Sequence, residues 1–287
     1  MKLVVPYPAG GFPDTVARVL AKALTEKWNQ QVIIDNRPGG NGAVAAQTIK
    51  SAGSDGYTLL VTDGSMFTIN PALYSKLEYD HKKDFVPVSA LGKAPLFVTV
   101  HPSVPANTLA EFIAYVKANP GKVNYGTSGI GSTHHLTGES FSSALGLNMV
   151  HVPFKGMGQA TPALVGGQVQ MIFSALPAIA GFVKDNRVQL LAQNSSKRFS
   201  QAPNIPTIAE TAIPGFDFAP TTIVMAPSGT PAAVLKQLST DVAAAIRTPA
   251  VAETLLNSGV EVIGSSSDEL ARVLAEESER FAKIIKA

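Results

Sequence analysis

At 287 residues the chain lies at the length where single hydrophobic cores usually give way to two domains. Hydrophobic residues make up 45% of it and charged residues 15%, which excludes the charge-rich, apolar-poor composition of disordered proteins. The net charge is only +2, without runs of Lys and Arg interleaved with aromatic residues. We therefore expect two folded lobes and no nucleic acid or acidic membrane surface as a partner.

The sequence contains no cysteine, which excludes disulfides, thiolate catalysis and cysteine-bound zinc. No stretch approaches the roughly 20 apolar residues of a membrane span. The run Leu3–Val5 is too short for the core of a signal peptide, and Lys2–Pro6 already has the pattern of a core strand. For an exported protein we therefore expect Met1 to replace a signal peptide that has been removed.

Short apolar strands alternate with helical patterns in the first part of the chain, which is typical of parallel α/β units. Asp14 stands where the N-cap of the first helix is expected. Each predicted strand ends in a turn that contains glycine. The predicted strands are Leu3–Pro6, Val32–Ile34 and Tyr57–Val61. Two helices are predicted: the first has Val16, Leu20, Ala23 and Leu24 on its inward face, and the second is Ala43–Lys50.

The same alternation starts again near Phe97, without a repeat at the level of single residues. A turn rich in Gly, Ser and Thr, Gly126–Thr133, separates the second strand of this region from its helix. The predicted strands are Phe97–Val100, Val123–Tyr125, Met149–Val152, Met171–Phe173 and Leu190–Ala192, and the predicted helices are Leu109–Asn119 and Leu136–Leu145.

The last part of the chain is expected to return to the first lobe. Thr222–Ala226 reads as a strand, Thr230 and Pro231 as the N-cap and first residue of a helix, and Ser266 with Glu269 as a capping box before the final helix. We predict lobe one at 1–96 and 223–287, lobe two at 97–222, and a hinge formed by two chain crossings near 92–98 and 219–223.

Two strand-to-helix turns are candidates for binding an anion. Ligands of open α/β sheets bind beyond the carboxyl ends of the strands, where helix N-termini present unpaired N–H groups. Pro8–Asp14 and Gly126–Thr133 have this position, and facing each other they would hold a carboxylate through backbone and hydroxyl donors. For Ser132 or Thr133 an equal alternative is that the side chain only caps the following helix.

Other ligands and reactions find little support in the motifs. Neither the phosphate-binding P-loop nor the dinucleotide fingerprint occurs. The segment around Ser128 lacks the final glycine of a nucleophile elbow, and only Ser128 with His135 comes near a nucleophile and base. His135 and Glu139 stand four residues apart without a third metal ligand at a diagnostic spacing. We expect no catalysis, no cofactor and no metal.

Motifs along nearly the whole chain carry a family resemblance. They lie at 5–18, 36–42, 55–60, 70–73, 125–139, 152–156, 166–169 and 226–231, and include Val5-Pro6-Tyr7-Pro8-Ala9-Gly10-Gly11 and Tyr125-Gly126-Thr127-Ser128-Gly129. Together they resemble the Bug (TctC-type) family, the extracytoplasmic solute receptors of tripartite tricarboxylate transporters.

The resemblance implies a periplasmic solute-binding protein with two α/β lobes and a ligand cleft between them, which closes about its hinge on a small carboxylate. It implies membrane components of a tripartite transporter as partners, and we expect a monomer. In this family the ligand carboxylate is held by the two turns, partly through ordered water. Carried over, these contacts are Gly10, Gly11, Thr127, Ser128, Ser132 and Thr133.

Departures from the family pattern bear on which ligand is bound. Phe12, where the family often has a small residue, would stack on a planar ligand, and His134 and His135 would meet a distal carboxylate. We therefore take an aromatic dicarboxylate of terephthalate type as the first expectation. The alternative is that Phe12 packs as a hydrophobic lid and His135 is structural. Asp63, where a neutral residue is commoner, would suit an amino group instead.

Three further hypotheses stay open: an aliphatic di- or tricarboxylate or an amino acid as ligand, a ligand-sensing module for a signalling partner, and an enzyme acting on a carboxylated substrate. The full set of candidate ligand-binding residues is Gly10, Gly11, Phe12, Asp14, Asp63, Ser65, Thr127, Ser128, Ser132, Thr133, His134, His135 and Phe154.

Overall fold

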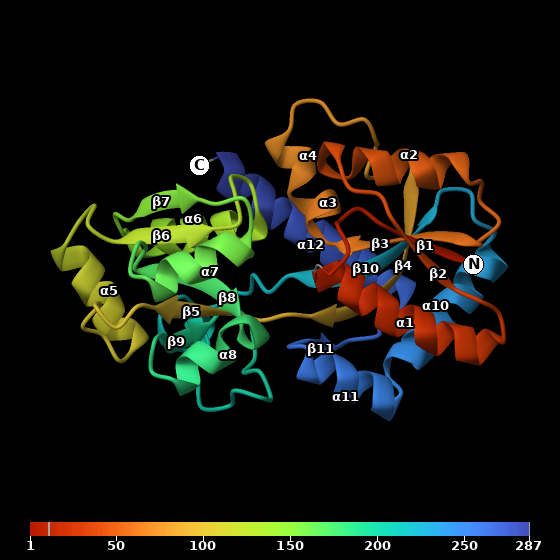
Figure 1. Ribbon diagram of the computed structural model, residues 1–287. Helices are drawn as coiled ribbons and strands as arrows, with labels where there is room; N and C mark the ends of the chain where they lie inside the picture. Colours follow the sequence, from red (N-terminus) through yellow and green to blue (C-terminus); the bar gives the residue numbers. More distant parts are fainter. Residues whose placement is uncertain (11, 287) are drawn as a thin grey trace. The chain divides into compact units, whose positions relative to one another are not determined.

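A computed structural model describes residues 1–10 and 12–286, and the chain forms two compact units (Figure 1). Unit one consists of Met1–Lys93 and Pro220–Ala287, and unit two of Ala94–Ala219. The chain therefore passes between the units twice, and bending at 92–98 and 219–223 stays a prediction. Within the described ranges, no helix is both long and apolar enough to cross a membrane.

Unit one contains a six-stranded sheet with the order β11-β4-β10-β3-β1-β2. The three strands nearest the N-terminus run parallel, whereas β10 is antiparallel to both of its neighbours. The strands are β1 (Lys2–Val5), β2 (Ile33–Asn36), β3 (Thr58–Asp63), β4 (Phe85–Lys93), β10 (Thr221–Pro227) and β11 (Glu261–Val262).

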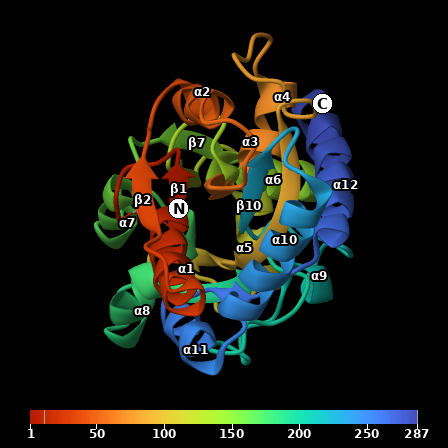
Figure 2. The same cartoon turned by 90° about the vertical axis from the view of Figure 1, so that its right-hand side faces the viewer.

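Helices cover both faces of this sheet, as Figure 2 shows. They are α1 (Phe12–Trp28), α2 (Ala43–Ser51), α3 (Ser65–Thr68), α4 (Asn70–Leu73), α10 (Ala232–Ile246), α11 (Pro249–Asn257) and α12 (Ser267–Lys286), with a 3₁₀ turn, η1, at Gly40–Gly42.

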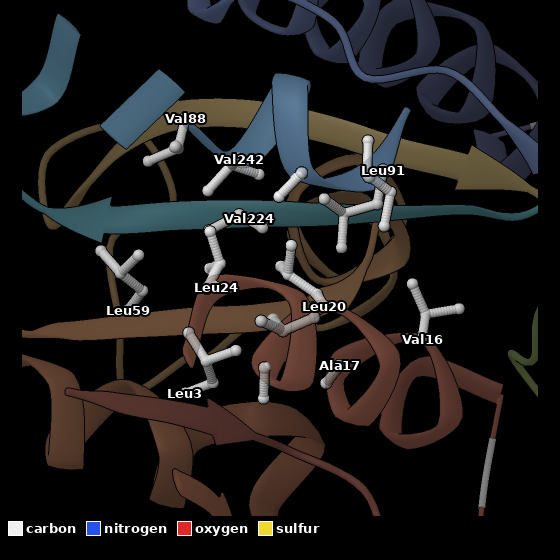
Figure 3. Packing of buried hydrophobic residues seen from close by; sticks show 14 of the residues in the cluster. Leu3, Val16, Ala17, Leu20, Leu24, Leu59, Val88, Leu91, Val224 and Val242 are labelled. Atoms are coloured by element: carbon white, nitrogen blue, oxygen red, sulfur yellow. The ribbon is translucent and has the colours of Figure 1, made fainter. Parts of the chain in front are cut away.

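The alternation of side chains along β1 explains the two layers. Leu3 and Val5 point into one core with Leu20 of α1, whereas Val4 points into a second core with Ile49 of α2. Figure 3 shows the first of these cores, in which Leu20 lies near Leu3 and Val224. Burying one such side chain contributes about 1.5–3 kcal/mol, so the apolar alternation fixes which face each helix covers.

Unit two contains a five-stranded sheet with the order β7-β6-β8-β5-β9. On β8, Ile172 belongs to the core with α7, whereas Phe173 meets Phe141 of α6 edge to face at 6.0 Å. The strands are β5 (Leu96–Val100), β6 (Asn124–Thr127), β7 (Val150–Pro153), β8 (Met171–Ala175) and β9 (Gln189–Gln193); the helices are α5 (Leu109–Ala118), α6 (Thr133–Leu145), α7 (Met157–Val165), α8 (Leu176–Lys184) and α9 (Ile208–Thr211).

The two sheets share one plan. In each, the first parallel strand lies between the second and the third, since β1 lies between β2 and β3, and β6 lies between β7 and β8. The third parallel strand of each unit, β3 or β8, has an antiparallel strand on its other side. This is β10 in unit one, where the chain returns from unit two, and β5 in unit two, where the chain arrives from unit one. The turns that leave β1 and β6 are therefore equivalent, and both lie at a topological switch point.

Several expectations need correction. The α/β class is confirmed, and both sheets are mixed, since β10 and β5 run antiparallel to their neighbours. Helix α1 begins at Phe12, so Asp14 lies in its first turn and is not the N-cap. Pro231 occupies the N-cap of α10, and the Thr230 hydroxyl donates to the Pro227 carbonyl instead. The capping box of Ser266 and Glu269 is confirmed.

Strands β4 and β11 and helices α3, α4, α7, α8, α9 and α11 were not among the predicted elements. Strand β4 contains Pro87, which lacks the N–H that a central strand needs. The ladder accommodates it with a register shift between Val224 and Met225 on β10. Because proline is normally found outside central strands, the sequence around Pro87 did not indicate strand β4.

Candidate functional site

The turn after β1 is held by a buried carboxylate in the first turn of α1. Asp14 is 0% exposed. Its Oδ2 accepts from the Gly10 backbone N–H at 2.8 Å and from Arg18 Nε at 2.8 Å, and its Oδ1 accepts from Arg18 at 3.1 Å and Asn36 at 2.8 Å. These bonds fill the four acceptor positions of a carboxylate. Asp14 thus supports the turn and has no acceptor left for a ligand.

The ionisation of Asp14 follows from these contacts. Burial alone would raise its pKa, but the hydrogen bonds from Arg18, Gly10 and Asn36 and the Arg18 charge outweigh burial and lower the pKa. The carboxylate is therefore ionised at neutral pH. Gly10 has φ +86°, and nothing lies within 4 Å of the position where a Cβ would be, so the backbone is open to an approaching group. Gly11 lies outside the described residues.

Asp63 and Ser65 support the same turn from the end of β3. Asp63 Oδ2 accepts from the Tyr7 hydroxyl at 2.8 Å, and its Oδ1 accepts from the Ser65 backbone N–H at 2.8 Å. Burial, and then the Asp63 charge, raise the pKa of Tyr7 well above its usual value. Asp63 therefore links the ends of β1 and β3, with each of its oxygens already bonded inside unit one.

Phe12 is the first residue of α1 and is partly buried. Its side chain packs against the core formed by α1, α10 and the sheet of unit one. This contact agrees with the alternative that Phe12 serves as a hydrophobic lid, while part of the side chain remains exposed.

The turn after β6 is built around the N-terminus of α6. Ser132 is the N-cap, because its Oγ accepts from the His135 backbone N–H at 3.2 Å, and the same hydroxyl donates to the Gly129 carbonyl at 2.7 Å. The capping alternative thus holds for Ser132. Thr133 is the first residue of α6, and its hydroxyl has no hydrogen-bond partner among the described residues.

Ser128 is paired with His134, at 2.9 Å between Oγ and Nδ1. The pair that came nearest to a nucleophile and base in the sequence, Ser128 with His135, is therefore not the pair that forms. Burial lowers the pKa of His134 to about 4, so this imidazole is neutral at physiological pH. In the described part of the chain no other group bonds to His134, whereas a catalytic serine–histidine pair normally has a third group that orients the imidazole.

His135 points into a cluster beneath the turn. Its Nδ1 accepts from the Gly131 backbone N–H at 3.1 Å, and its ring stacks on that of His151 with centroids 4.0 Å apart. His151 Nε2 lies 2.7 Å from Thr127 Oγ1, and the His151 ring also stacks on Tyr125 at 5.1 Å. Two imidazoles thus hold the turn at Thr127 and at Gly131.

Glu139 completes this cluster. Its Oε1 accepts from the Tyr125 hydroxyl and lies 3.8 Å from His135 Nε2. Burial lowers the pKa of both histidines: the Glu139 charge partly opposes this shift, whereas each imidazole, when charged, disfavours charge on the other. His151 was not predicted as a site residue. Its signal is the alternation in Val150-His151-Val152, which places the histidine on the face shared with Tyr125, its partner in the parallel ladder.

Phe154 follows β7 and is partly buried against the core of α7 and α8. Its backbone N–H donates to the Thr127 carbonyl at 3.0 Å. A Cβ on Gly126 would lie 3.2 Å from the Phe154 ring. Phe154 therefore packs over the start of the turn and supports it.

The chemistry of both turns is that of neutral donors. Neither 7–10 nor 126–133 contains Lys or Arg, so an anion there would be bound by backbone N–H groups and hydroxyls. Over residues 1–10 and 12–286, no group of three or more His, Asp or Glu side chains is arranged to hold a metal ion.

Comparison with known proteins identifies relatives over the full chain. Protein BugT of Bordetella pertussis is 32% identical over 287 residues, covering 100% of this chain and 88% of the relative. A UPF0065 protein of the same organism is 35% identical over 286 residues, with the same coverage.

Solved structures agree with this relationship. Rpa4515 of R. palustris with adipate has a TM-score of 0.87 and 33% identity, covering 100% of this chain and 96% of that one. MatC of Rhodopseudomonas palustris with bound malate has a TM-score of 0.82 and 30% identity, covering 99% and 98%. The family model described as the tripartite tricarboxylate transporter family receptor, TctC, matches residues 16–287. The chain therefore belongs to the TctC family of tripartite tricarboxylate transporter receptors.

Proposed function

We propose that this protein is a periplasmic receptor that binds a small dicarboxylate at the turns after β1 and β6 and delivers it to the membrane components of a tripartite transporter. The observation that carries the proposal is the equivalence of these turns. Each leaves the central parallel strand of its sheet at a switch point, where α/β proteins bind ligands, and each offers neutral donors without a cation.

The donors differ between the turns. After β1 a ligand can approach the backbone at Gly10 closely. The Gly10 N–H already donates to Asp14, so the donors for a ligand would be other N–H groups at the N-terminus of α1, at the positive end of its dipole. After β6 the candidates are the hydroxyls of Ser128 and Thr133, because Ser132 is engaged as the N-cap. Ligand contacts from both units would favour a closed state about the two chain crossings, and closure is what the membrane partners would recognise.

An aliphatic dicarboxylate of four to six carbons is our first candidate ligand, since the relatives with adipate and malate are 33% and 30% identical to this chain. An aromatic dicarboxylate such as terephthalate is the second, favoured by the partly exposed Phe12 beside the first turn. An amino acid is the third candidate: the bonds from Tyr7 and Ser65 fill two of the four acceptor positions of Asp63, so its carboxylate could still accept from an amino group.

Isothermal titration calorimetry with adipate, malate, terephthalate and aspartate tests the proposal. We expect at least one dicarboxylate to bind, and Thr133→Val to weaken it by about tenfold, the value of one lost hydrogen bond to a charged group. Thr254→Val, which removes a hydroxyl of α11 bonded only to the Ala250 carbonyl, is the control. A folded protein that binds none of these acids contradicts the proposal.

The choice between aliphatic and aromatic ligands depends on Phe12. Aromatic stacking contributes about 0.5–1.5 kcal/mol beyond burial, so Phe12→Ala should weaken terephthalate about three- to tenfold more than adipate. Equal losses for both ligands would remove the aromatic candidate.

The sensor and enzyme alternatives call for separate measurements. Isolation of the protein with a signalling protein instead of transporter membrane components would favour a sensor. Product formed from a carboxylated substrate, and abolished by Ser128→Ala, would favour an enzyme.

A further inference from the structure

The stacked imidazoles of His135 and His151 lie in unit two, within the described residues, and contact the turn after β6 at Thr127 and Gly131. The Gly131 N–H donates to His135 Nδ1 at 3.1 Å, and a nitrogen that accepts a hydrogen bond cannot carry a proton. His135 is therefore neutral in this arrangement, with its proton on Nε2. Protonation of Nδ1 would break the bond to the turn.

His151 provides the second contact. Its Nε2 lies 2.7 Å from Thr127 Oγ1, and its ring is 4.0 Å from that of His135, with 21° between the planes. Charging both rings would place two cations in contact, which like-charge repulsion opposes. Thr127 and Gly131 delimit the loop. Thr127 is also held by the ladder of β6 and by the Phe154 N–H, so the Gly131 end depends most on its imidazole.

The other titratable groups against the pair are few in the described part of unit two. Glu139 lies on the same helix as His135, with Oε1 3.8 Å from His135 Nε2, and Tyr125 on β6 stacks on His151 and donates to Glu139. Glu139 is the one group here that favours an imidazolium. Its Oε1 also accepts a hydrogen bond from the Tyr125 hydroxyl, and burial lowers the pKa of both histidines despite the Glu139 charge.

We propose that His135, with His151 stacked on it, is a positioning residue that keeps the Thr127–Gly131 loop in its carboxylate-binding form only while its Nδ1 is unprotonated, so that acidification releases the ligand. The inference rests on the function proposed above and deepens it. The change of ligand affinity with pH distinguishes this role from direct contact. If a histidine touched the ligand carboxylate, its protonation would strengthen binding, whereas protonation of a positioning histidine weakens it.

The test measures the Kd of adipate and of malate between pH 7.5 and pH 5.0 for the unaltered protein and for His135→Asn. The Asn amide oxygen can accept from Gly131 as Nδ1 does, but it does not titrate. Both proteins experience the same titration of the ligand, so the difference between them isolates His135. Because a group contributes up to tenfold per pH unit below its pKa, we expect the Kd of the unaltered protein to rise at least about threefold more than that of the variant.

His101→Asn is the matched control. His101 also lies in unit two, and its Nδ1 also accepts from a backbone N–H, that of Ser103 at 3.2 Å, but in the turn after β5. Its pH profile should match that of the unaltered protein.

A measurement without ligand covers the case in which His135→Asn fails to fold. In ¹⁵N spectra of uniformly ¹⁵N-labelled protein, His135 Nδ1 should have the shift of an unprotonated acceptor at pH 7.5, and the Gly131 amide proton should move upfield as the pH falls. Equal pH profiles for the unaltered protein and His135→Asn, tighter binding at low pH that depends on His135, or a protonated Nδ1 at pH 7.5 would each overturn this inference. Failure of every acid to bind at pH 7.5 would overturn the proposed function instead.

Discussion

The turns after β1 and β6 are each held by a side chain that accepts a hydrogen bond from the backbone, but the accepting groups differ in charge. After β1, a buried ionised carboxylate accepts from the backbone at Gly10, and Arg18 and Asn36 complete its bonds. After β6, a neutral imidazole accepts from the backbone at Gly131, and a second imidazole lies against Thr127. One turn is thus supported by a charge with its partners, and the other by an imidazole whose accepting nitrogen must stay unprotonated.

This difference predicts distinct responses to acid. The pKa of Asp14 is lowered, so its stabilising effect is present above the unfolded value of about 4 and is lost only as the pH falls through the lower folded value. The pKa values of His135 and His151 are also lowered, but from about 6.5. The stability that the two neutral histidines contribute therefore decreases as the pH falls below about 6.5. At that pH Asp14 is still ionised, and the turn after β1 keeps its hydrogen bonds.

Removing the carboxylate should have the largest effect. Asp14→Ala leaves the Gly10 N–H and Asn36 without their acceptor and the exposed Arg18 without its partner, and we expect a loss of about 2–4 kcal/mol in the free energy of unfolding. Urea denaturation measures it. Asp185→Ala, at an exposed site after α8, should change stability by less than about 0.5 kcal/mol. A similar small change for Asp14→Ala would mean that the carboxylate does not hold the turn.

Crowding the aromatic cluster should cost less. A Cβ on Gly138 of α6 would lie 2.5 Å from the ring of buried Tyr125, and overpacking of this kind costs about 1–3 kcal/mol. Gly138→Ala should also weaken dicarboxylate binding, because Tyr125 stacks on His151. The matched change Gly181→Ala, in α8 with nothing within 4 Å, should stabilise the protein by up to about 1 kcal/mol. Calorimetric unfolding compares the two, and equal effects would contradict the close contact.

Loss of the helix cap should have the smallest effect on stability. Ser132→Ala removes the N-cap of α6 and Thr108→Ala that of α5, each at about 1 kcal/mol. Only Ser132→Ala should also weaken dicarboxylate binding, because it frees the Gly129 carbonyl in the turn. If both variants bind as well as the unaltered protein, the Ser132 side chain acts only as a cap.

The candidate site was predicted as two turns, but the partners of its side chains were not. Ser128 lies close in sequence to both His134 and His135, and helix geometry, together with the burial of each ring, selects His134. The role of His151 cannot be read from its neighbours in the sequence, because its partner Thr127 is 24 residues away. Asp14 looked like a cap by its position, whereas in the fold Asn36, 22 residues further on, helps to fill its acceptors.

The sequence by itself determined the positions of most strands and of the longest helices, the glycine-bearing turns and the family, because these depend on apolar periodicity and on motifs within a few residues. Only the tertiary structure decided that β5 and β10 run antiparallel, that Tyr7 bonds to Asp63, 56 residues away, and that two histidines stack beneath a turn. Such pairs form where strand order and register bring distant residues together, and no local pattern encodes that distance.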